Sequence, residues 1–205
     1  DTQYRMNEEI MRFSSSWFYD GKVKAAPITA HRGILDYDTP IEWVDDVAND
    51  DETVGETFVG ETFGRINKVE ARQVMELLQA YFEKIGKQRI LDESIDVGII
   101  SPYRAQVQYL RHLIKKETFF KPFRHLLSVN TVDGFQGQER DIIIVSLVRS
   151  NNDGQIGFLR DLRRMNVAMT RARSKLIIIG DHETLAHHEF YNKLYEYIKS
   201  LSIDI

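Results

Sequence analysis

The sequence predicts an α/β fold in which a mainly parallel sheet is flanked by helices. Two apolar runs, residues 141–148 and 176–180, have the continuous Ile, Leu and Val content of strands that are covered on both faces. Other stretches carry apolar residues with the period of an amphipathic helix. Because strands alternate with helices along the chain, neighbouring strands are expected to run parallel.

Each predicted element follows from its own pattern of apolar residues. Helical spacing covers residues 4–20, which end in a turn at Asp20 and Gly21. In chain order, the expected strands are 41–44, 95–100, 126–129, 141–148 and 176–180. The other expected helices are 68–85, 105–116, 162–174 and 183–201. Residues 45–64 are acidic and contain glycines, so we expect a solvated surface loop or an insertion there.

The composition narrows the class of protein. A length of 205 residues and a hydrophobic fraction of 42% fit one domain with a sizeable core, or one domain with an insertion. The absence of cysteine excludes a disulfide framework and a thiolate metal site. No apolar run approaches the length of a membrane span, and no signal peptide is evident, so we expect a soluble, cytoplasmic protein. A net charge of −4 argues against strong autonomous binding of nucleic acid, although a local basic groove is compatible with it.

Ligands of parallel sheets usually bind at the carboxyl ends of the strands, so we expect the functional loops after residues 100, 129, 148 and 180. Residues 98–106 run from a strand through a Ser-Pro turn into a helix. The N–H groups at that helix start could bind a backbone phosphate, or Ser101 could simply cap the helix. Residues 3–6 join an aromatic ring to a guanidinium, which could stack on a base and reach a phosphate. Such a tetrapeptide also fits the solvated start of a helix.

Residues 130–141 are rich in glycine, amides and carboxylates between two predicted strands. Gly137 would let the backbone approach a ligand closely, and Glu139 could accept hydrogen bonds from a ribose. A plain turn is the alternative, but it would not need this composition over so many residues.

Residues 163–173 contain four arginines and no acidic residue to pair with them. On one continuous helix, Arg164 and Arg171 would project in nearly the same direction. A neighbouring apolar stripe would seat that helix, and it consists of Met165, Met169 and Ala172. The pattern predicts binding of an external anion such as a γ-phosphoryl group, with a solvated basic face as the alternative.

Together these segments resemble the C-terminal motor domain of superfamily 1B helicases, and most of all the group that contains the nonsense-mediated-decay and immunoglobulin-mu-binding helicases. The resemblance covers nearly the whole chain, and in order it runs through residues 3–6 (motif IV), 98–106, 131–139 (motif V), 157–159 and 163–173 (motif VI). It implies a RecA-like domain of the P-loop NTPase type over residues 1–205, with an acidic loop or insertion at about 45–64. The family usually has His-Pro after the first motif, whereas Asn7 and Glu8 stand here, and we expect this to alter a turn and not the chemistry.

The resemblance also implies roles for single residues. Tyr4 would stack on the adenine, Arg5 would reach the γ-phosphate, and Arg171 would be the arginine finger, which makes Arg5 and Arg171 the expected catalytic residues. The other expected nucleotide contacts are Gln3, Gly137, Glu139 and Arg164. The expected nucleic-acid contacts are Ser101, Pro102, Tyr103, Thr131 and Asp133.

The sequence contains neither a Gly-x-x-x-x-Gly-Lys-Ser/Thr phosphate loop nor an acidic pair that would bind magnesium. The family carries both in an N-terminal RecA-like domain, so we expect that domain as a partner, ATP with Mg²⁺ as the cofactor, and no hydrolysis by this chain alone. The expected substrate is a single-stranded nucleic acid, DNA slightly favoured over RNA, translocated 5′ to 3′, without a membrane partner. The alternatives are a stand-alone nucleic-acid-binding domain and a regulatory domain without hydrolysis.

Overall fold

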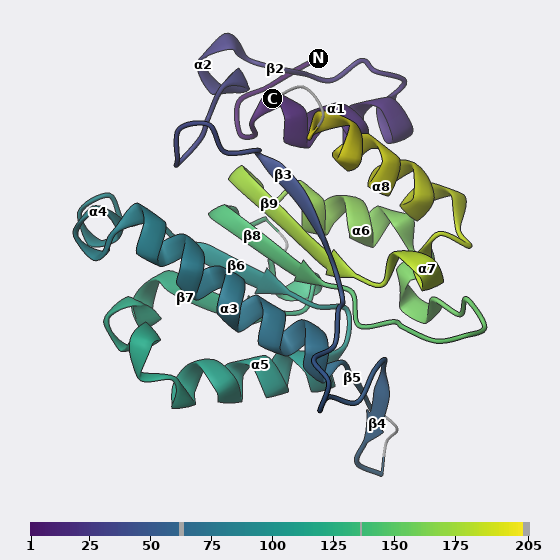
Figure 1. Ribbon diagram of the computed structural model, residues 1–205. Coiled ribbons are helices and arrows are strands. Elements are labelled where there is room, and N and C mark those ends of the chain that lie inside the picture. Colours follow the sequence, from purple (N-terminus) through teal and green to yellow (C-terminus); the bar gives the residue numbers. More distant parts are fainter. Residues whose placement is uncertain (62–63, 136, 203–205) are drawn as a thin grey trace.

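A five-stranded parallel sheet forms the middle layer of the protein (Figure 1). The computed structural model describes residues 1–61, 64–135 and 137–202. The strands lie in the order β3-β9-β8-β6-β7. Their bounds are β3 Ile41–Asp45, β6 Val97–Ile100, β7 Leu127–Asn130, β8 Arg140–Ser146 and β9 Ala172–Gly180. The predicted α/β class with a parallel sheet is therefore confirmed.

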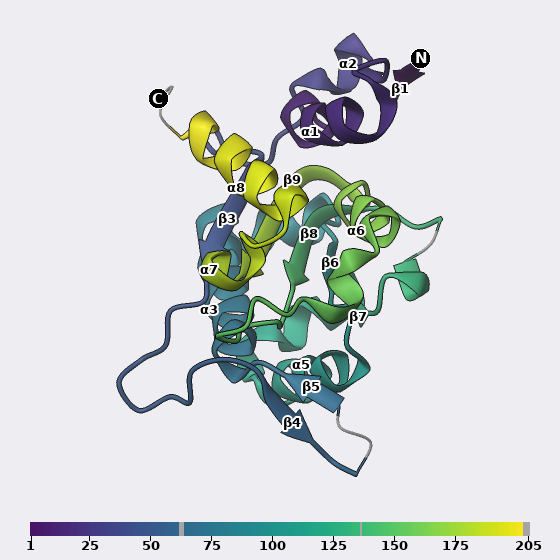
Figure 2. The same cartoon turned by 90° about the vertical axis from the view of Figure 1, so that its right-hand side faces the viewer.

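Helices cover both faces of this sheet, as Figure 1 shows. One face carries α3 (Lys68–Ile85), α4 (Lys87–Asp92), α5 (Arg104–Lys116) and the 3₁₀ helix η1 (Thr118–Leu126). The other face carries α6 (Leu162–Met169), α7 (His182–Leu185) and α8 (Glu189–Leu201), and α1 (Glu8–Tyr19) packs against α6 and β9 from the edge where the strands begin (Figure 2). Ile142 and Ile144 of β8 pack towards α3 and α5, whereas Ile143 and Val145 pack towards α6 and α8. This alternation explains why the central strands are apolar at every position.

A small N-terminal layer lies at the edge where the parallel strands begin (Figures 1 and 2). Together with α1 it contains β1 (Thr2–Gln3), β2 (Lys24–Ala25) and α2 (Pro27–Ala30). The Asn7 N–H group donates to the carbonyl of Arg173 at 2.9 Å, which ties the layer to the start of β9. The Asn7 side chain also accepts from the Glu9 N–H group at 2.8 Å and caps α1. The Asn7–Glu8 departure from the family pattern therefore lies in a capped turn.

The acidic segment 45–64 differs from the solvated loop that we predict from its composition. It leads into a short antiparallel pair, β4 (Thr57–Val59) and β5 (Gly64–Ile66), and β5 lies beside α5. The Glu56 side chain is buried, at 2.9 Å from Arg65 and 2.8 Å from Arg149. The Glu56 side chain is the exception in a segment whose described residues are mostly exposed or half-buried, because two arginines outside the segment pair with its carboxylate.

Two predicted helices are shorter or divided in the structure. The helix predicted over 162–174 ends at Met169, where the Thr170 hydroxyl donates to the Asn166 carbonyl at 2.8 Å. The chain then enters β9, because Ala172 pairs with Arg140 of β8. The helix predicted over 183–201 is divided into α7 and α8, and His188 caps the second helix. No helix in the described part of the chain is long and apolar enough to cross a membrane.

A fully buried carboxyl group, Glu70, and a half-buried one, Asp46, lie near the carboxyl ends of β3 and β8. Glu70 is fully buried and accepts hydrogen bonds from the Ser146 hydroxyl and the Val148 N–H group, both at 2.9 Å. Burial raises the pKa of Glu70 well above its ordinary value. Burial also raises the pKa of Asp46 from 3.8 to about 6, although a hydrogen bond from Asn67 opposes the increase.

The raised pKa of Asp46 leads to an expected pH dependence of stability. Folding disfavours the charged form, so the stabilisation is complete at low pH and is lost as the pH rises through the pKa of the folded state. The wild-type Tm should therefore fall relative to that of Asp46→Asn between about pH 4 and about pH 7.5. Thermal melting of both proteins at these two pH values measures the effect. A constant difference in Tm would show that Asp46 keeps its ordinary pKa.

Candidate functional site

The predicted site residues separate onto two opposite edges of the sheet. Glu139 and Arg171 come just before β8 and β9, at the edge where the strands begin. The predicted nucleic-acid contacts follow β6 and β7, at the edge where the strands end. Glu139 belongs to the loop after residue 129, as expected, but it lies at the far end of that loop, where β8 begins. The predicted nucleic-acid contacts lie at the carboxyl ends of the strands, where ligands of parallel sheets usually bind.

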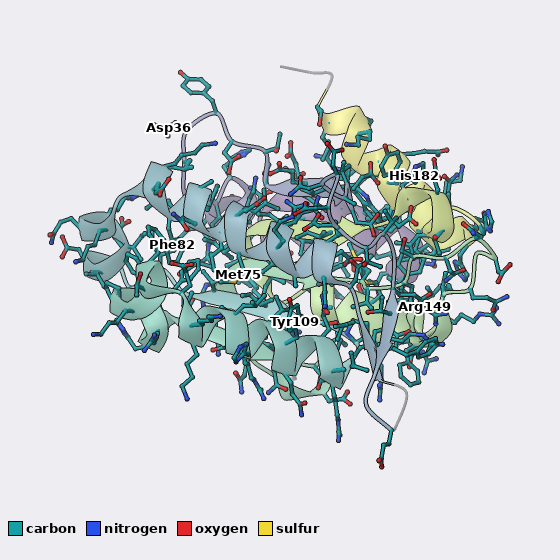
Figure 3. The ribbon with its side chains drawn as sticks, turned by 60° about the horizontal axis from the view of Figure 1, so that its bottom comes forward. Asp36, Met75, Phe82, Tyr109, Arg149 and His182 are labelled. Atoms are coloured by element: carbon teal, nitrogen blue, oxygen red, sulfur yellow. The ribbon has the colours of Figure 1, made fainter. Side chains whose placement is uncertain are left out.

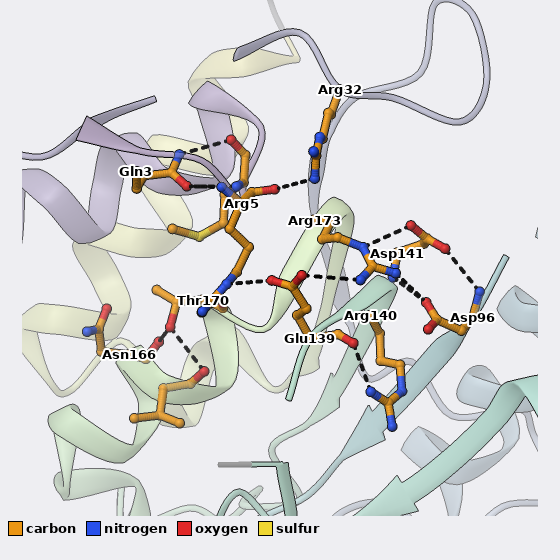
Figure 4. Close-up of polar contacts among 12 residues, drawn as sticks. Gln3, Arg5, Arg32, Asp96, Glu139, Arg140, Asp141, Asn166, Thr170 and Arg173 are labelled. Carbon is orange, nitrogen blue, oxygen red and sulfur yellow. Dashed lines mark hydrogen bonds and ion pairs between the residues drawn. The ribbon is translucent and has the colours of Figure 1, made fainter. Parts of the chain in front are cut away.

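A cluster of charged side chains occupies the edge where the strands begin (Figure 4). The Glu139 carboxylate lies 2.6 Å from Arg5 Nε through one oxygen and 3.4 Å from Arg173 Nη1 through the other. Arg173 also lies 2.9 Å from Asp96 and 3.1 Å from Asp141, so its planar fork holds three carboxylates. We call this set the amino-edge cluster, and its members are Arg5, Asp96, Glu139, Asp141, Arg171 and Arg173.

The carboxylates of this cluster depend on their cationic neighbour. Burial raises the pKa of Asp96, and the charge of the Asp141 carboxylate also raises it, whereas the hydrogen bond from the Asp141 N–H group and the charge of Arg173 lower it. Two carboxylates beside each other repel, and Arg173 is the guanidinium that lies between them. Arg173 therefore keeps Glu139 in a position from which it contacts Arg5.

Arg171 lies outside the helix on which we place it from the sequence. It stands in the turn between α6 and β9, so it does not project beside Arg164. Its side chain is half-buried, and its Nε has no hydrogen-bond partner among the residues that the structure describes. Burial lowers the pKa of Arg171, the neighbouring Arg5 lowers it further, and Glu139 opposes the decrease. Arg5 Nη1 donates to the carbonyl of the adjacent Thr170 at 3.3 Å, which brings it near Arg171. Two neighbouring guanidinium groups, one with an unused buried donor, favour binding of an anion.

Gln3 shapes the loop that presents Arg5. Its side-chain oxygen accepts from the N–H groups of Arg5 at 2.7 Å and Met6 at 2.8 Å, and its Nε2 donates to the Met6 carbonyl at 3.0 Å. A nucleotide contact by Gln3 would therefore require these hydrogen bonds to open. Tyr4 between them is 70% exposed, which leaves its ring open to a ligand.

Gly137 lies in the loop that leads from the end of β7 to the start of β8. Its φ of +74° is in the left-handed region, which favours glycine, and open space surrounds the position of a Cβ atom. The same loop contains the short 3₁₀ helix η2 (Asp133–Phe135), whose Phe135 packs into the core. The same loop thus carries predicted nucleic-acid contacts near the end of β7 and predicted nucleotide contacts near the start of β8.

A groove at the other edge contains most of the predicted nucleic-acid contacts. It is lined by Pro102, Tyr103, Thr131 and Asp133, together with Arg65, Arg104, Phe158 and Arg164. Ser101 is fully buried, so a contact between its side chain and a ligand would require the groove to open. It does not cap α5, because Tyr103 is the N-cap residue and its N–H group donates to the Ser101 hydroxyl at 3.4 Å.

Arg164 belongs with this groove and not with the amino-edge cluster. It lies 3.3 Å from Asp133 and 3.5 Å from Asp161, at the first turn of α6. Arg171 follows the last turn of the same helix, so the two arginines lie at opposite ends of it. The structure therefore does not bring Arg164 to the other predicted nucleotide contacts. The sequence pattern failed here because it extended α6 past Met169.

Six residues of the two sites were not singled out from the sequence, namely Arg65, Asp96, Arg104, Asp141, Phe158 and Arg173. Four of them lie within the polar segments and motifs and could have been found there by their neighbours, namely Arg104, Asp141, Phe158 and Arg173. Arg65 reaches the groove only because β4 and β5 pair, for which we see no local signal. In the described residues, no group of His, Asp and Glu side chains is placed to hold a metal ion.

The AAA domain family matches residues 1–183, and the chain belongs to this family. An uncharacterised ATP-dependent helicase of Methanocaldococcus jannaschii is 37% identical over 210 residues, covering 98% of this chain and 29% of the relative. The DNA polymerase alpha-associated DNA helicase A of Saccharomyces cerevisiae is 38% identical over 201 residues, covering 90% of this chain and 28% of the relative. A regulator of nonsense transcripts 1 homologue of Neurospora crassa is 34% identical over 205 residues, covering 96% of this chain and 18% of the relative.

Within this family the chain is the C-terminal RecA-like motor domain of a superfamily 1B helicase, as its motifs predict. It spans less than a third of the length of the three relatives described above. The similarity to regulator of nonsense transcripts 1 homologues confirms the resemblance to the nonsense-mediated-decay helicase group.

Proposed function

We propose that this domain supplies one half of the ATPase site of a helicase, with the amino-edge cluster turned towards the nucleotide. The observation that carries the proposal is the half-buried Arg171, whose buried Nε lacks a hydrogen-bond partner in the described part of the chain and which adjoins Arg5. An arginine that stabilises the charge of a transferring γ-phosphoryl group needs free donors in a partly desolvated place. Arg171 meets both requirements.

The residues of the cluster fit ATP as the cofactor. ATP with Mg²⁺ supplies the γ-phosphoryl group that is transferred to water. Arg171 and Arg5 would bind its anionic oxygens, and the exposed Tyr4 would stack on the adenine. Glu139 orients Arg5 through a 2.6 Å contact and has the acceptors for a ribose hydroxyl. The ATP-dependent helicases among the relatives support use of this nucleotide.

The exposure of the cluster supports a second domain as a partner. Arg5 and Glu139 are each 38% exposed, so water would screen their interaction with a phosphate. A second surface is needed to exclude this water and to bring a phosphate loop and the magnesium ligands. We propose that the N-terminal RecA-like domain of the same protein provides them, and that closure of the two domains assembles the site.

The groove at the other edge of the sheet is the proposed contact to a single-stranded nucleic acid. Arg104 and Arg164 suit backbone phosphates, whereas Arg65 is paired with Glu56. The loop from Thr131 to Glu139 leads from this groove to the amino-edge cluster. A shift of that loop would couple strand binding to the position of Glu139. The name of one relative mentions a DNA helicase, and that of another mentions nonsense transcripts. We propose single-stranded DNA as the favoured substrate.

A strand-displacement assay with the full-length protein tests the proposed function. We expect ATP-dependent unwinding of a duplex with a 5′ single-stranded overhang, no unwinding with a 3′ overhang, and ATP hydrolysis that rises when single strand is added. The isolated 205-residue domain is the matched control, and it should not hydrolyse ATP because its sequence lacks the phosphate loop. Hydrolysis by the domain alone, or hydrolysis by the full-length protein without any effect of single strand, would contradict the proposal.

A further inference from the structure

Phe158 is a large exposed aromatic side chain in the groove. It belongs to the 3₁₀ helix η3 (Gly157–Arg160), and it is 66% exposed. Its ring lies against that of Tyr103, with 5.4 Å between the centroids and 32° between the planes. A ring held in this position offers a ligand a flat apolar face, and a ligand that covers it removes apolar surface from water.

A buried polar group holds the partner ring of Phe158. Tyr103 is 6% exposed, and its hydroxyl accepts a hydrogen bond from Arg149 Nη1 at 3.2 Å. Arg149, labelled in Figure 3, is buried in turn and lies 2.8 Å from Glu56. The groove therefore presents Phe158 against the Tyr103 ring, which Arg149 and its buried ion pair with Glu56 hold in place.

Gly157 is required for this arrangement. Its φ of +52° is in the left-handed region, and a Cβ atom there would overlap Arg149 Nη1 and lie 2.8 Å from the Tyr103 hydroxyl. Only glycine brings the backbone this close to the buried pair. The contact between Phe158 and Tyr103 therefore requires glycine at position 157, because any other side chain would collide with Arg149 and Tyr103.

The charges around Phe158 favour an anion. The groove is lined by Arg65, Arg104 and Arg164, and Asp133 is its one acidic side chain among the described residues that line it. Arg65 is paired with Glu56, and Arg164 lies 3.3 Å from Asp133 and 3.5 Å from Asp161, so Arg104 is the arginine of the groove without a carboxylate partner in the described part of the chain. Arg104 is exposed at the first position of α5, and Arg164 is exposed on α6. A ligand that fits this lining carries negative charges at intervals and flat apolar groups between them. Single-stranded nucleic acid has this chemistry.

We propose that Phe158 is a stacking platform for one base of the strand, while Arg104 and Arg164 neutralise the neighbouring phosphates. This inference rests on the proposed function, because it assigns a base contact within the proposed strand-binding groove. Stacking on an aromatic ring accepts every base, so the contact tightens binding without reading sequence. The affinity of this domain for single-stranded nucleic acid would then depend on the bases as well as on the phosphates.

Binding of two labelled strands to the full-length protein tests the platform, by fluorescence anisotropy without nucleotide. One strand is oligothymidylate, and the other has the same length and phosphates but abasic sites in place of its bases. Phe158→Ala should weaken binding of oligothymidylate about tenfold and binding of the abasic strand less than about twofold. Phe158→Trp should keep the wild-type preference for bases. Arg164→Ala should weaken binding of both strands, because it removes a phosphate contact.

The controls separate the platform from the proposed function. Tyr37→Ala removes a fully exposed aromatic ring outside the groove and should leave both affinities unchanged. Equal weakening of both strands by Phe158→Ala, or no change in either, would overturn the platform while strand binding stands. Equal wild-type affinity for the two strands would overturn it as well. If the wild-type protein binds neither strand, the proposed strand-binding function fails, and the inference fails with it.

Discussion

Replacement of Arg171 by alanine in the full-length protein is expected to lower ATP turnover by at least about 10²-fold. The guanidinium would contact a phosphoryl group whose charge grows in the transition state, so its loss should affect kcat more than KM. Because the buried Nε of Arg171 has no hydrogen-bond partner in the described part of the chain, its removal leaves no such partner unsatisfied. The change in Tm should therefore be small.

Steady-state ATP hydrolysis with saturating single strand measures this effect. Arg171→Lys should restore only part of the activity, because an ammonium group cannot reproduce the planar fork. Arg163→Ala is the matched control, since Arg163 is an exposed arginine of the neighbouring helix α6. Wild-type turnover in Arg171→Ala would remove the arginine-finger role, and a large fall in Tm would show that Arg171 is structural.

Replacement of Arg173 by alanine should affect both activity and stability. Asp96, Glu139 and Asp141 would lose the guanidinium that holds them, at 2.9, 3.4 and 3.1 Å respectively. The free energy of unfolding should fall by about 1 to 3 kcal/mol near neutral pH, because charged groups are left without partners. Glu139 would no longer be held from both sides, so ATP turnover should fall by about tenfold through misplacement of Arg5.

The pH dependence distinguishes this role from ordinary packing. The pKa of Asp96 is already raised in the folded protein, and loss of Arg173 should raise it further. The destabilisation should therefore grow as the pH rises through the pKa values of the carboxyls and shrink below them. Urea unfolding at about pH 4.5 and about pH 7.5 tests this expectation, with Arg163→Ala as the control. An equal loss of stability at both pH values would contradict it.

Local patterns were sufficient to predict the frame of the fold. The helix predicted over residues 68–85 matches α3, because Asn67 caps its start, Gly86 ends it, and its apolar face has a clear period. The central strands were recognisable because burial on both faces makes them apolar throughout. Short-range regularities of this kind can be seen in one sequence.

Contacts between distant segments were not predictable in the same way. The start of β9 at Ala172 depends on pairing with Arg140, and this pairing ends α6 before Arg171. The contact between Arg173 and Asp96 joins residues 77 positions apart in the chain. The motifs therefore indicated which residues matter, whereas the sheet decided which of them lie together.

The role of Arg171 is tested most directly by the affinity of the full-length protein for ADP, measured with and without aluminium fluoride. The ADP–aluminium fluoride complex mimics the transferring phosphoryl group, and transition-state analogues bind more tightly than ground-state ligands. We expect aluminium fluoride to increase the affinity of the wild-type protein for ADP. In Arg171→Ala this increase should be lost, while the affinity for ADP alone stays unchanged. The same increase in both proteins would contradict a contact between Arg171 and the transferring group.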